Sequence, residues 1–396
     1  MKIAWFKRVI TPELGTLITG YTAGDVSVAK HDDLMVTGLC LDDGRSRSLL
    51  VSLDLLALDG WYIRSLRGKC ARLLNTRPEQ ILFSCTHNHS GPEAATPLAT
   101  NSDKLNRPFI ERLEKIILQS VQELSDFREC AAGFYSCRCD GNRNRRYVAP
   151  DNRTSFTPHR REVVPLALEY ADRELGDLCF FDPATGAPLY LVGNYAAHPL
   201  AGHSPGLSGM IDCQRNWKRF HIADPVLGGK IKSFTVPIRR KFQKRVPPEY
   251  QGKTEVTLEI QCFSIGDICL VSMPGEVCAE LGQEIKWHSP FRKAFIAYYA
   301  TSDFSCMCLA NFLISGGDEG NTRQFGSLGG LTLVPRSKRC SNSAASCSRM
   351  RRTRKGTASR PSGPSAGGLA ARQLITGWEN RFKEPKKNIW GKTCLI

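Results

Sequence analysis

Short, continuous runs of apolar residues, separated by polar turns and helix-like segments, constrain the fold more than any other feature of the chain. Residues 34–41, 48–58 and 81–84 are apolar runs of strand length, and the first two are separated by the turn-forming stretch Asp42-Asp-Gly-Arg45. Apolar side chains on both faces of a strand are typical of a sheet that is covered on both sides. The pattern therefore predicts sheets buried between other layers.

Two further segments, one between these runs and one after them, have apolar residues at helical spacing. Apolar residues recur at that spacing at Ile63, Leu66, Cys70 and Leu73, and again at Ile110, Leu113, Ile117, Val121 and Leu124. Pro108 suits the first turn of the second helix. Strands joined through helices indicate an α/β fold, in which mixed β-sheets pack together and are flanked by helices.

The remainder of the first 300 residues continues this alternation. Further strands are predicted at residues 163–169, 178–181, 189–197, 255–263 and 268–272, followed by a helix at 277–286. Residues 133–165 are polar and rich in arginine, and we predict a loop there.

Polar residues that can bind a metal follow three of the predicted strands. His87 and His89 follow the strand at 81–84, His198 follows the strand at 189–197, and Glu276 lies at a strand-to-helix turn. In an extended backbone residues two apart point to the same side, so His87 and His89 can face one cavity. Two histidines and a glutamate are a known ligand set of catalytic zinc. The alternative is that each polar residue only terminates its strand in a solvated loop.

The charge of the chain is unevenly distributed. Of the 54 Lys and Arg residues and 38 acids, 15 Lys/Arg and two acids lie in residues 331–396, which leaves 39 − 36 = +3 of the net +16 for the first 330 residues. A basic tail can bind phosphate backbones or anionic lipid. A segment this rich in Ser, Arg, Gly, Ala and Pro also lacks the apolar content to fold alone, and a shifted reading frame would produce the same composition. We favour a disordered tail or a frame artefact over a binding arm, and no helix-turn-helix or aromatic-interleaved pattern supports specific nucleic-acid binding.

Charges near the N-terminus and the distribution of cysteines bear on the compartment. Lys2, Lys7 and Arg8 interrupt the region in which a signal peptide would be apolar, and no run approaches the roughly 20 apolar residues of a transmembrane span, so we expect a cytoplasmic protein. The 16 cysteines are scattered through apolar runs and are expected to be free thiols.

Several short motifs occur in an order that is similar to a known family. They are Ile10-Thr-Pro-Glu-Leu-Gly-Thr16 with Gly20-Tyr21, Val51-Ser-Leu-Asp54, Thr86-His-Asn-His-Ser-Gly-Pro92, Asn144-Arg-Arg146, Asn194-Tyr-Ala-Ala-His-Pro199 and Pro274-Gly-Glu276. Together they resemble the neutral/alkaline, non-lysosomal ceramidase family in its compact prokaryotic form, over roughly the first 320 residues.

The resemblance implies a zinc amidase that cleaves the N-acyl bond of a sphingolipid. By matching position His87, His198 and Glu276 would be metal ligands, and His89 would hydrogen-bond the substrate or shuttle a proton. Arg145 would orient the substrate or stabilise the oxyanion. Zinc would polarise the amide carbonyl and lower the pKa of a bound water to ~7.

The chain departs from the family pattern in three places. A tyrosine ligand of the family is replaced within Gly316-Gly-Asp-Glu-Gly320 by Asp318, whose shorter side chain is a further candidate ligand. Residues 209–230 replace a longer active-site segment, which predicts an internal deletion. Residues 328–396 form the basic, low-complexity tail, which leaves residues 1–327 as the predicted catalytic domain.

These observations lead to two competing functions. The first is a zinc-dependent hydrolase of N-acyl amide bonds, acting on a small-molecule or lipid amide and impaired in this copy by the missing segment. The alternative is a catalytically inactive scaffold or binding protein with the same fold. The oligomeric state is open.

Overall fold

The computed structural model describes most of the first 300 residues. The described residues are 1–20, 24–95, 105–142, 144, 147–148, 154–155, 164–165, 171–197, 221–238, 251–301, 306–307 and 393–395. The chain divides into two units, Met1–Val334 with Lys392–Ile396, and Pro335–Gly391. All described residues belong to the first unit, and the predicted domain boundary after residue 327 stays a prediction.

The first layer of strands is a mixed five-stranded sheet with the order β4-β3-β2-β1-β5. Its strands are β1 (Lys2–Val9), β2 (Met35–Asp42), β3 (Arg47–Leu53), β4 (Ile81–Cys85) and β5 (Arg128–Glu129). Neighbours are antiparallel except β3 and β4, which are parallel and joined through α1 (Gly60–Leu73) and the 3-10 helix η1 (Pro78–Gln80).

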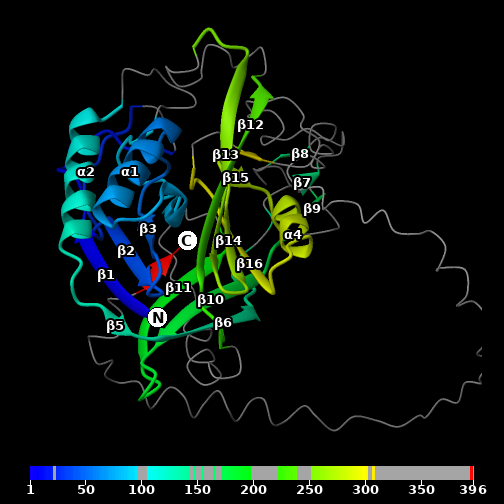
Figure 1. Cartoon of the computed structure of the whole chain (residues 1–396). Coiled ribbons are helices and arrows are strands. Elements are labelled where there is room, and N and C mark those ends of the chain that lie inside the picture. Colours follow the sequence, from blue (N-terminus) through cyan, green and yellow to red (C-terminus); the bar gives the residue numbers. More distant parts are fainter. Residues whose placement is uncertain are drawn as a thin grey trace, which may run out of the picture. The chain divides into compact units, whose positions relative to one another are not determined.

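Two helices cover the outer face of this sheet. Helix α1 and helix α2 (Arg107–Gln122) lie side by side on it (Figure 1). Helix α2 begins where the Asn106 side chain accepts a hydrogen bond from the Phe109 amide at 3.1 Å, and its apolar stripe includes Leu113 and Ile117. Both residues are buried with Ile63 and Leu66 of α1 against the sheet, as the helical spacing predicts.

The inner face of the first sheet packs on a second layer made of two four-stranded sheets. One has the order β18-β11-β10-β6 and the other β12-β13-β14-β16. Their strands are β6 (Ala131–Arg138), β10 (Glu174–Phe181), β11 (Pro188–Tyr195), β12 (Leu227–Pro237), β13 (Glu255–Ile265), β14 (Ile268–Ser272), β16 (Lys293–Ala297) and β18 (Thr393–Leu395). Leu39 and Leu50 of the first sheet share one apolar core with Phe180, Phe263 and Phe295 of the second layer.

Helix α4 (Ala279–Trp287) lies on the side of the second layer opposite to α1 and α2 (Figure 1). The short strands β15 (Glu276–Val277) and β17 (Cys306–Met307) pair in parallel, and β7 (Tyr147–Val148), β8 (Thr154–Ser155) and β9 (Val164–Pro165) form a small antiparallel sheet. The prediction of mixed sheets packed together and flanked by helices is confirmed. None of the described helices is long and apolar enough to cross a membrane.

The predicted loop at residues 133–165 is wrong at its beginning and again where the short strands β7, β8 and β9 pair. Residues up to Arg138 form β6, which pairs antiparallel with β10 over its whole length. Phe134 packs against the core between the layers, whereas Tyr135 packs on the other face of the sheet. This alternation identifies a strand, and the arginines further along the chain conceal it. The predicted strand at 48–58 also ends early, because residues after Leu53 leave the sheet.

Two segments far apart in the sequence share one topology. We call β1, β2, β3, α1, β4 and the residues directly after β4 the first module (residues 2–89), and β12, β13, β14, α4, β16 and the residues directly after β16 the second module (residues 227–299). In each, three antiparallel strands are followed by a helix and a strand parallel to the third. The connection from third strand to helix has six residues in both, 54–59 and 273–278.

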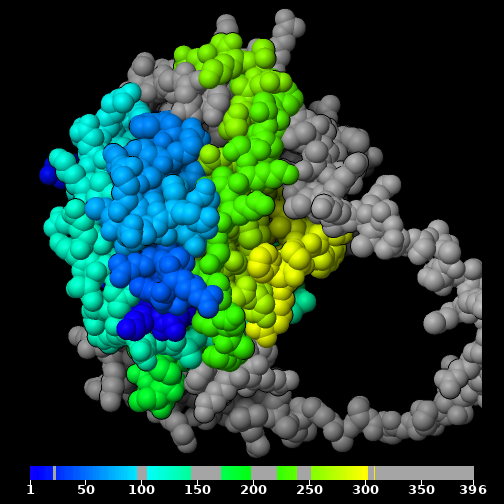
Figure 2. Space-filling view, viewed as in Figure 1, coloured from blue at the N-terminus to red at the C-terminus, as the bar shows by residue number. Residues whose placement is uncertain are grey.

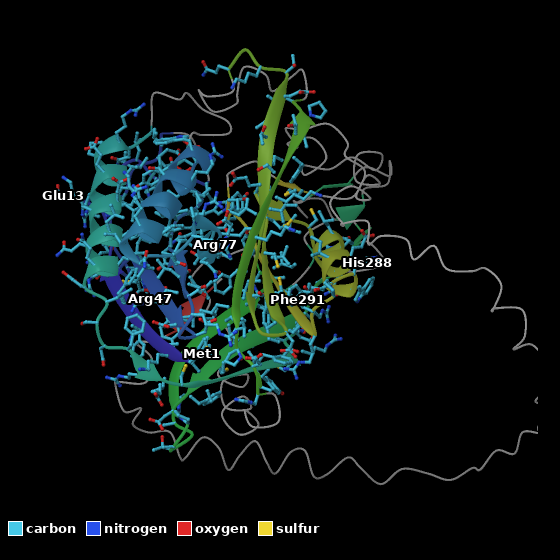
Figure 3. All side chains as sticks on the ribbon, in the orientation of Figure 1. Met1, Glu13, Arg47, Arg77, His288 and Phe291 are labelled. Carbon is cyan, nitrogen blue, oxygen red and sulfur yellow. The ribbon has the colours of Figure 1, made fainter. Side chains whose placement is uncertain are left out.

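The two modules lie side by side on the face shown in Figure 2, the first in blue and the second in green and yellow. Figure 3 marks Arg47 at the beginning of β3 in the first module, and His288 and Phe291 after α4 in the second. Of the atypical stretch at residues 209–230, the structure describes residues from His221 onward, in which Ile222 is buried in the core between the layers. The predicted deletion itself stays a prediction.

Candidate functional site

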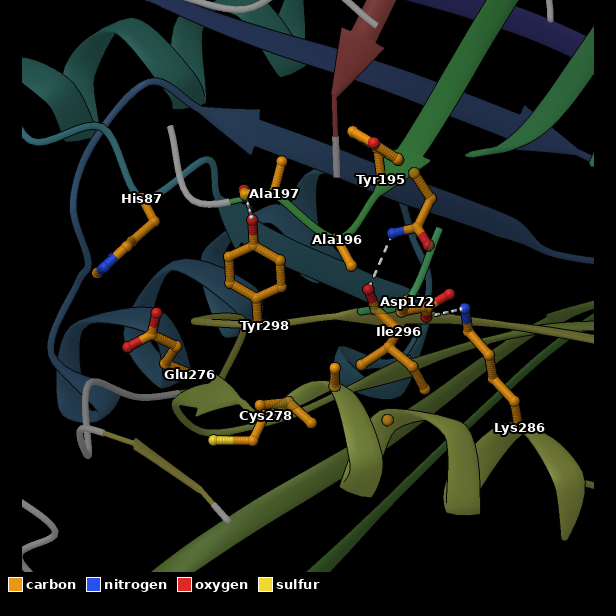
Figure 4. Close-up of a pocket in the computed structure, with 14 residues that line it drawn as sticks. His87, Asp172, Tyr195, Ala196, Ala197, Glu276, Cys278, Lys286, Ile296 and Tyr298 are labelled. Carbon is orange, nitrogen blue, oxygen red and sulfur yellow. Dashed lines mark hydrogen bonds and ion pairs between the residues drawn. The ribbon is translucent and has the colours of Figure 1, made fainter. Parts of the chain in front are cut away.

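A cavity of about 160 Å³ lies where four strands end. His87 follows β4, Ala196 and Ala197 follow β11, Glu276 follows β14, and Tyr298 follows β16, and all of them line the cavity (Figure 4). Side chains at strand ends can take part in chemistry while the sheets hold them in place. The cavity therefore brings together residues of both modules.

His87 and His89 form a closely spaced pair of imidazoles. Their Nε2 atoms are 3.1 Å apart. Nδ1 of His87 is 3.1 Å from the Leu56 carbonyl, and Nδ1 of His89 is 2.7 Å from the Gly20 carbonyl. His87 is only 6% exposed, so the pair lies largely out of solvent.

The carbonyl contacts determine where the ring protons are. A carbonyl oxygen only accepts, so Nδ1 of each ring must donate, and a neutral imidazole then carries a lone pair at Nε2. Two lone pairs facing each other at 3.1 Å repel unless a positive charge lies between or beside them. A shared proton or a bound cation satisfies this requirement.

The carbonyl contacts of the two rings are of a kind that metal-binding histidines also make. Histidines that bind metals usually donate their other ring N–H to a carbonyl or carboxylate, as both rings do here. Figure 4 shows the Glu276 carboxylate on the same side of the cavity as the His87 ring.

The backbone at His87 is unusual. Its φ is +61°, in the left-handed region that non-glycine residues rarely adopt. His87 and His89 therefore do not meet through an extended backbone, and of the two only His87 lines this cavity, while His89 contacts the His87 ring. The ring of His87 stacks on Tyr299, with centroids 4.3 Å apart and planes 8° apart, and Tyr299 itself has a φ of +48°.

Tyr298 connects the second module to the end of β11. It is buried beside Glu276, and burial together with the Glu276 carboxylate raises the pKa of its phenol. The protonated hydroxyl donates to the Ala197 carbonyl at 3.3 Å (Figure 4). Tyr298 therefore holds the residue that precedes His198 in the sequence.

The Asp54 side chain connects the beginning of β2 to the residue that follows β4. Its carboxylate accepts from the Met35 amide at 2.9 Å and from the Thr86 hydroxyl at 3.3 Å. Burial raises the pKa of this carboxyl despite the two donors. The contact with Thr86 connects two of the sequence motifs directly and fixes the residue before His87.

A charged cluster closes the opposite wall of the cavity. The Lys286 ammonium is 2.6 Å from Asp172 and 3.1 Å from Glu174. Burial opposes ionisation of Glu174, but hydrogen bonds and charges of Lys293 and Lys286 hold the pKa of its carboxyl below its usual value. The Lys286 charge is thus balanced by protein carboxylates and is not free to bind an anionic ligand.

Two asparagines hold the part of the cavity wall that lies at the end of β11. Asn142 donates to the backbone carbonyls of Asp172 at 2.6 Å and Ala196 at 2.8 Å. Asn194 donates to the Ile296 carbonyl at 2.9 Å and so joins β11 to β16. These bonds fix the β11 end relative to the second module.

The structure describes some of the predicted site residues and not others. It places His87 and Glu276 on one cavity and His89 in contact with His87. Arg145, His198 and Asp318 lie outside the described residues. Within the described part of the chain no group of three or more His, Cys, Asp or Glu side chains is arranged to hold a metal ion.

Tyr298, Lys286 and Asp172 line the cavity but were not predicted from the sequence. Tyr298 carried a usable signal, because it is a polar residue directly after an apolar run, as His87 is. Asp172 and Lys286 carried none, since their pairing depends on the packing of α4 near β10.

Comparison with known proteins supports the fold. No family model matches the chain, and no curated protein sequence matches it. The solved structure of neutral ceramidase from Pseudomonas aeruginosa is similar, with a TM-score of 0.61 and 13% identity over 82% of this chain and 71% of that one. A ceramidase complexed with C2 is similar with a TM-score of 0.58 and 13% identity, covering 82% of this chain and 72% of that one. The chain therefore has a ceramidase-like fold.

Proposed function

We propose that the protein is a zinc-dependent hydrolase that cleaves the N-acyl bond of a small-molecule or lipid amide. The His87–His89 pair carries the proposal, since both Nδ1 atoms contact carbonyls and the two Nε2 atoms lie 3.1 Å apart. Glu276 on the same cavity adds a carboxylate, and imidazole with carboxylate is a ligand set of catalytic zinc. The ceramidase-like fold supports the reaction class.

Each candidate residue would have its own role in binding zinc or in the reaction. His87 and Glu276 would bind the zinc, with His198 and Asp318 as the further proposed ligands. A bound zinc ion supplies a polarised amide carbonyl and a water whose pKa falls to ~7. His89, held by the Gly20 carbonyl, would accept a proton at Nε2 and return it to the leaving amine, and Arg145 would orient the substrate or stabilise the oxyanion.

The size of the cavity bears on the substrate. A volume of about 160 Å³ is close to that of a cavity that holds a benzene-sized group. The amide and its nearest carbons would fit, and longer chains of a lipid amide would extend beyond the described walls.

The direct test compares metal-free and zinc-loaded protein on a set of N-acyl amides that includes N-acylsphingosine. The proposal predicts release of free fatty acid only with zinc, and loss of that release in Glu276→Gln, which keeps the size of the side chain. His31→Ala is the matched control, because the His31 side chain is 96% exposed and is remote from the cavity residues in the sequence.

The second candidate function is a catalytically inactive scaffold or binding protein. It is favoured by the departures of the sequence from the family pattern at Asp318 and at residues 209–230. Zinc-loaded protein that binds N-acyl amides without hydrolysing them would establish this second function and exclude the first.

A further inference from the structure

Two cysteines in the second module lie in direct contact. Cys262 on β13 and Cys269 on β14 have their sulfur atoms 2.7 Å apart. The two strands form a tight hairpin that turns at Gly266 and Asp267, with Gly266 at a φ of +57°. The contact is therefore local to one hairpin and does not depend on how other elements pack.

The register of the hairpin explains why these sulfurs meet. Cys262 is opposite Val271 and Cys269 is opposite Ser264, so the two cysteines are diagonal neighbours on one face of the sheet. Phe263 and Leu270 alternate with them and point into the core between the layers. The cysteines are thus on the face that does not contact the first sheet.

The sulfur separation is close to that of a covalent bond. A disulfide bond is about 2.05 Å long, so the two sulfur atoms need to approach by well under an ångström. Both cysteines are free thiols in the structure.

The two thiols are chemically unequal. Cys269 is 1% exposed, whereas Cys262 is only partly buried. The hydrogen bond from the Cys269 thiol lowers the pKa of Cys262, and that bond together with burial raises the pKa of Cys269. The thiolate is the nucleophilic form, so Cys262 is the sulfur that reacts first.

We propose that Cys262 and Cys269 form a redox dithiol that a hydroperoxide converts to a disulfide. The Cys262 thiolate attacks a peroxide oxygen, the O–O bond breaks, and protonation of the leaving oxygen yields water or an alcohol and a sulfenic acid on Cys262. The Cys269 sulfur then attacks the Cys262 sulfur, and the departing hydroxide takes the Cys269 proton to become water. Two thiols are oxidised by two electrons, and one hydroperoxide is reduced.

Other cysteines provide an internal comparison. Burial raises the pKa of Cys40, Cys70 and Cys130 to about 12 in each case, so these thiols are protonated and shielded from oxidant. Cys278 is partly buried like Cys262 and lies only a few residues further along the chain. It is the matched control for a cysteine of similar exposure outside the hairpin.

The experiment treats the reduced, folded full-length chain with hydrogen peroxide, blocks remaining thiols with iodoacetamide, and maps the products by mass spectrometry. Cleavage after glutamate releases residues 260–276, which contain Cys262 and Cys269 but not Cys278. We expect this peptide to carry no alkyl group and to be lighter than the dithiol by two hydrogen atoms. Reduction before blocking should restore two alkylated cysteines.

Variants separate the two steps. In Cys269→Ser, Cys262 should stop at the sulfenic acid and be trapped by dimedone, whereas Cys278→Ser should form the disulfide as the parent chain does. The same treatment in denaturant should abolish the preference for this pair. Two alkylated cysteines in residues 260–276 after peroxide treatment of the folded parent chain, or a disulfide joining Cys262 to another cysteine, would overturn the proposal.

Discussion

The first and second modules share a topology but supply different chemistry to the cavity. In both, the last strand is followed two residues later by a non-glycine residue with positive φ, His87 after β4 and Tyr299 after β16. These two residues stack on each other. The Leu56 carbonyl accepts from His87 Nδ1, and the carbonyl at the corresponding position, Gly275, accepts from the Tyr299 amide at 3.3 Å.

The difference lies in the side chains that these equivalent positions carry. Counting along the six-residue connections, Glu276 of the second module corresponds to Ala57 of the first, and Met273 corresponds to Asp54. The first module supplies an imidazole to the cavity, and the second supplies a carboxylate and a phenol. The backbone topology therefore sets which positions reach the cavity, and the residue at each position determines the chemistry.

Removing the ion pair between the two modules should have the largest effect on the free energy of unfolding. Arg67 on α1 is buried and forms an ion pair with Glu259 on β13, and its guanidinium is 3.4 Å from Gln261 Oε1. Arg67→Ala leaves the Glu259 carboxylate without its partner, and breaking a buried pair typically costs about 3–5 kcal/mol. Urea unfolding of the variant should show a loss of this size.

Arg72 provides the control on the same helix. It is exposed in the last turn of α1, so Arg72→Ala should change the free energy of unfolding by no more than about 0.5 kcal/mol. If Arg67→Ala and Arg72→Ala lowered the free energy of unfolding equally, the ion pair of Arg67 with Glu259 would not stabilise the contact between the modules.

A buried carboxyl in the sheet beside the modules gives an intermediate effect. Burial raises the pKa of Asp177 on β10 from 3.8 to about 7, and its Oδ2 has no hydrogen-bond partner among the described residues. Because the folded pKa is raised, the folded state binds a proton more tightly, and stability present below pH 3.8 is lost as pH rises toward about 7. Asp177→Asn cannot ionise and therefore avoids this loss of stability, although burial of its amide group has a cost of its own. Above pH 7 its free energy of unfolding should exceed that of the parent by about 2 kcal/mol.

The measurement is thermal unfolding of both proteins from pH 4 to pH 8. The difference between them should grow across this range and level off above about pH 7. A difference that is independent of pH would show that the Asp177 carboxyl ionises normally in the folded protein.

The hydroxyl of Tyr298 gives the smallest effect on stability. Tyr298→Phe removes the hydrogen bond to the Ala197 carbonyl, which is worth about 1 kcal/mol. Because Ala197 precedes a proposed ligand, zinc affinity should also fall several-fold. Tyr62→Phe removes a comparable bond, from α1 to the Ile110 carbonyl of α2 at 2.8 Å. It should lower stability to a similar degree and leave zinc affinity unchanged, and equal zinc affinities in the two variants would refute a positioning role for Tyr298.

Much of the fold could be predicted because apolar periodicity is a local property. The strand at 268–272 and the helices α1 and α2 follow from it directly. Strand β1 was missed because Lys2, Lys7 and Arg8 lie on a strand whose Ile3 and Phe6 are buried on opposite faces. Strand β6 was missed for a similar reason, since flanking arginines outweigh a short alternating stretch.

The candidate site was predictable in composition but not in geometry. Strand ends identified His87, His89 and Glu276, and the structure brings His87 and Glu276 to one cavity. The left-handed backbone at His87 could not be predicted, because it depends on the Tyr299 ring more than 200 residues away in the sequence. The Lys286–Asp172 pair likewise arises only when α4 packs near β10.

The most direct test of the account is a double-mutant cycle of zinc affinity with His87→Ala, Glu276→Ala and the combined variant. One residue comes from each module, so the account predicts about one zinc per parent chain and a loss of at least ~100-fold in each single variant. The double variant should then bind little more weakly than either single one, because removing either ligand already opens the site. No zinc bound by the parent chain, or tight binding that survives in both single variants, would contradict the claim that the two modules together build a metal site.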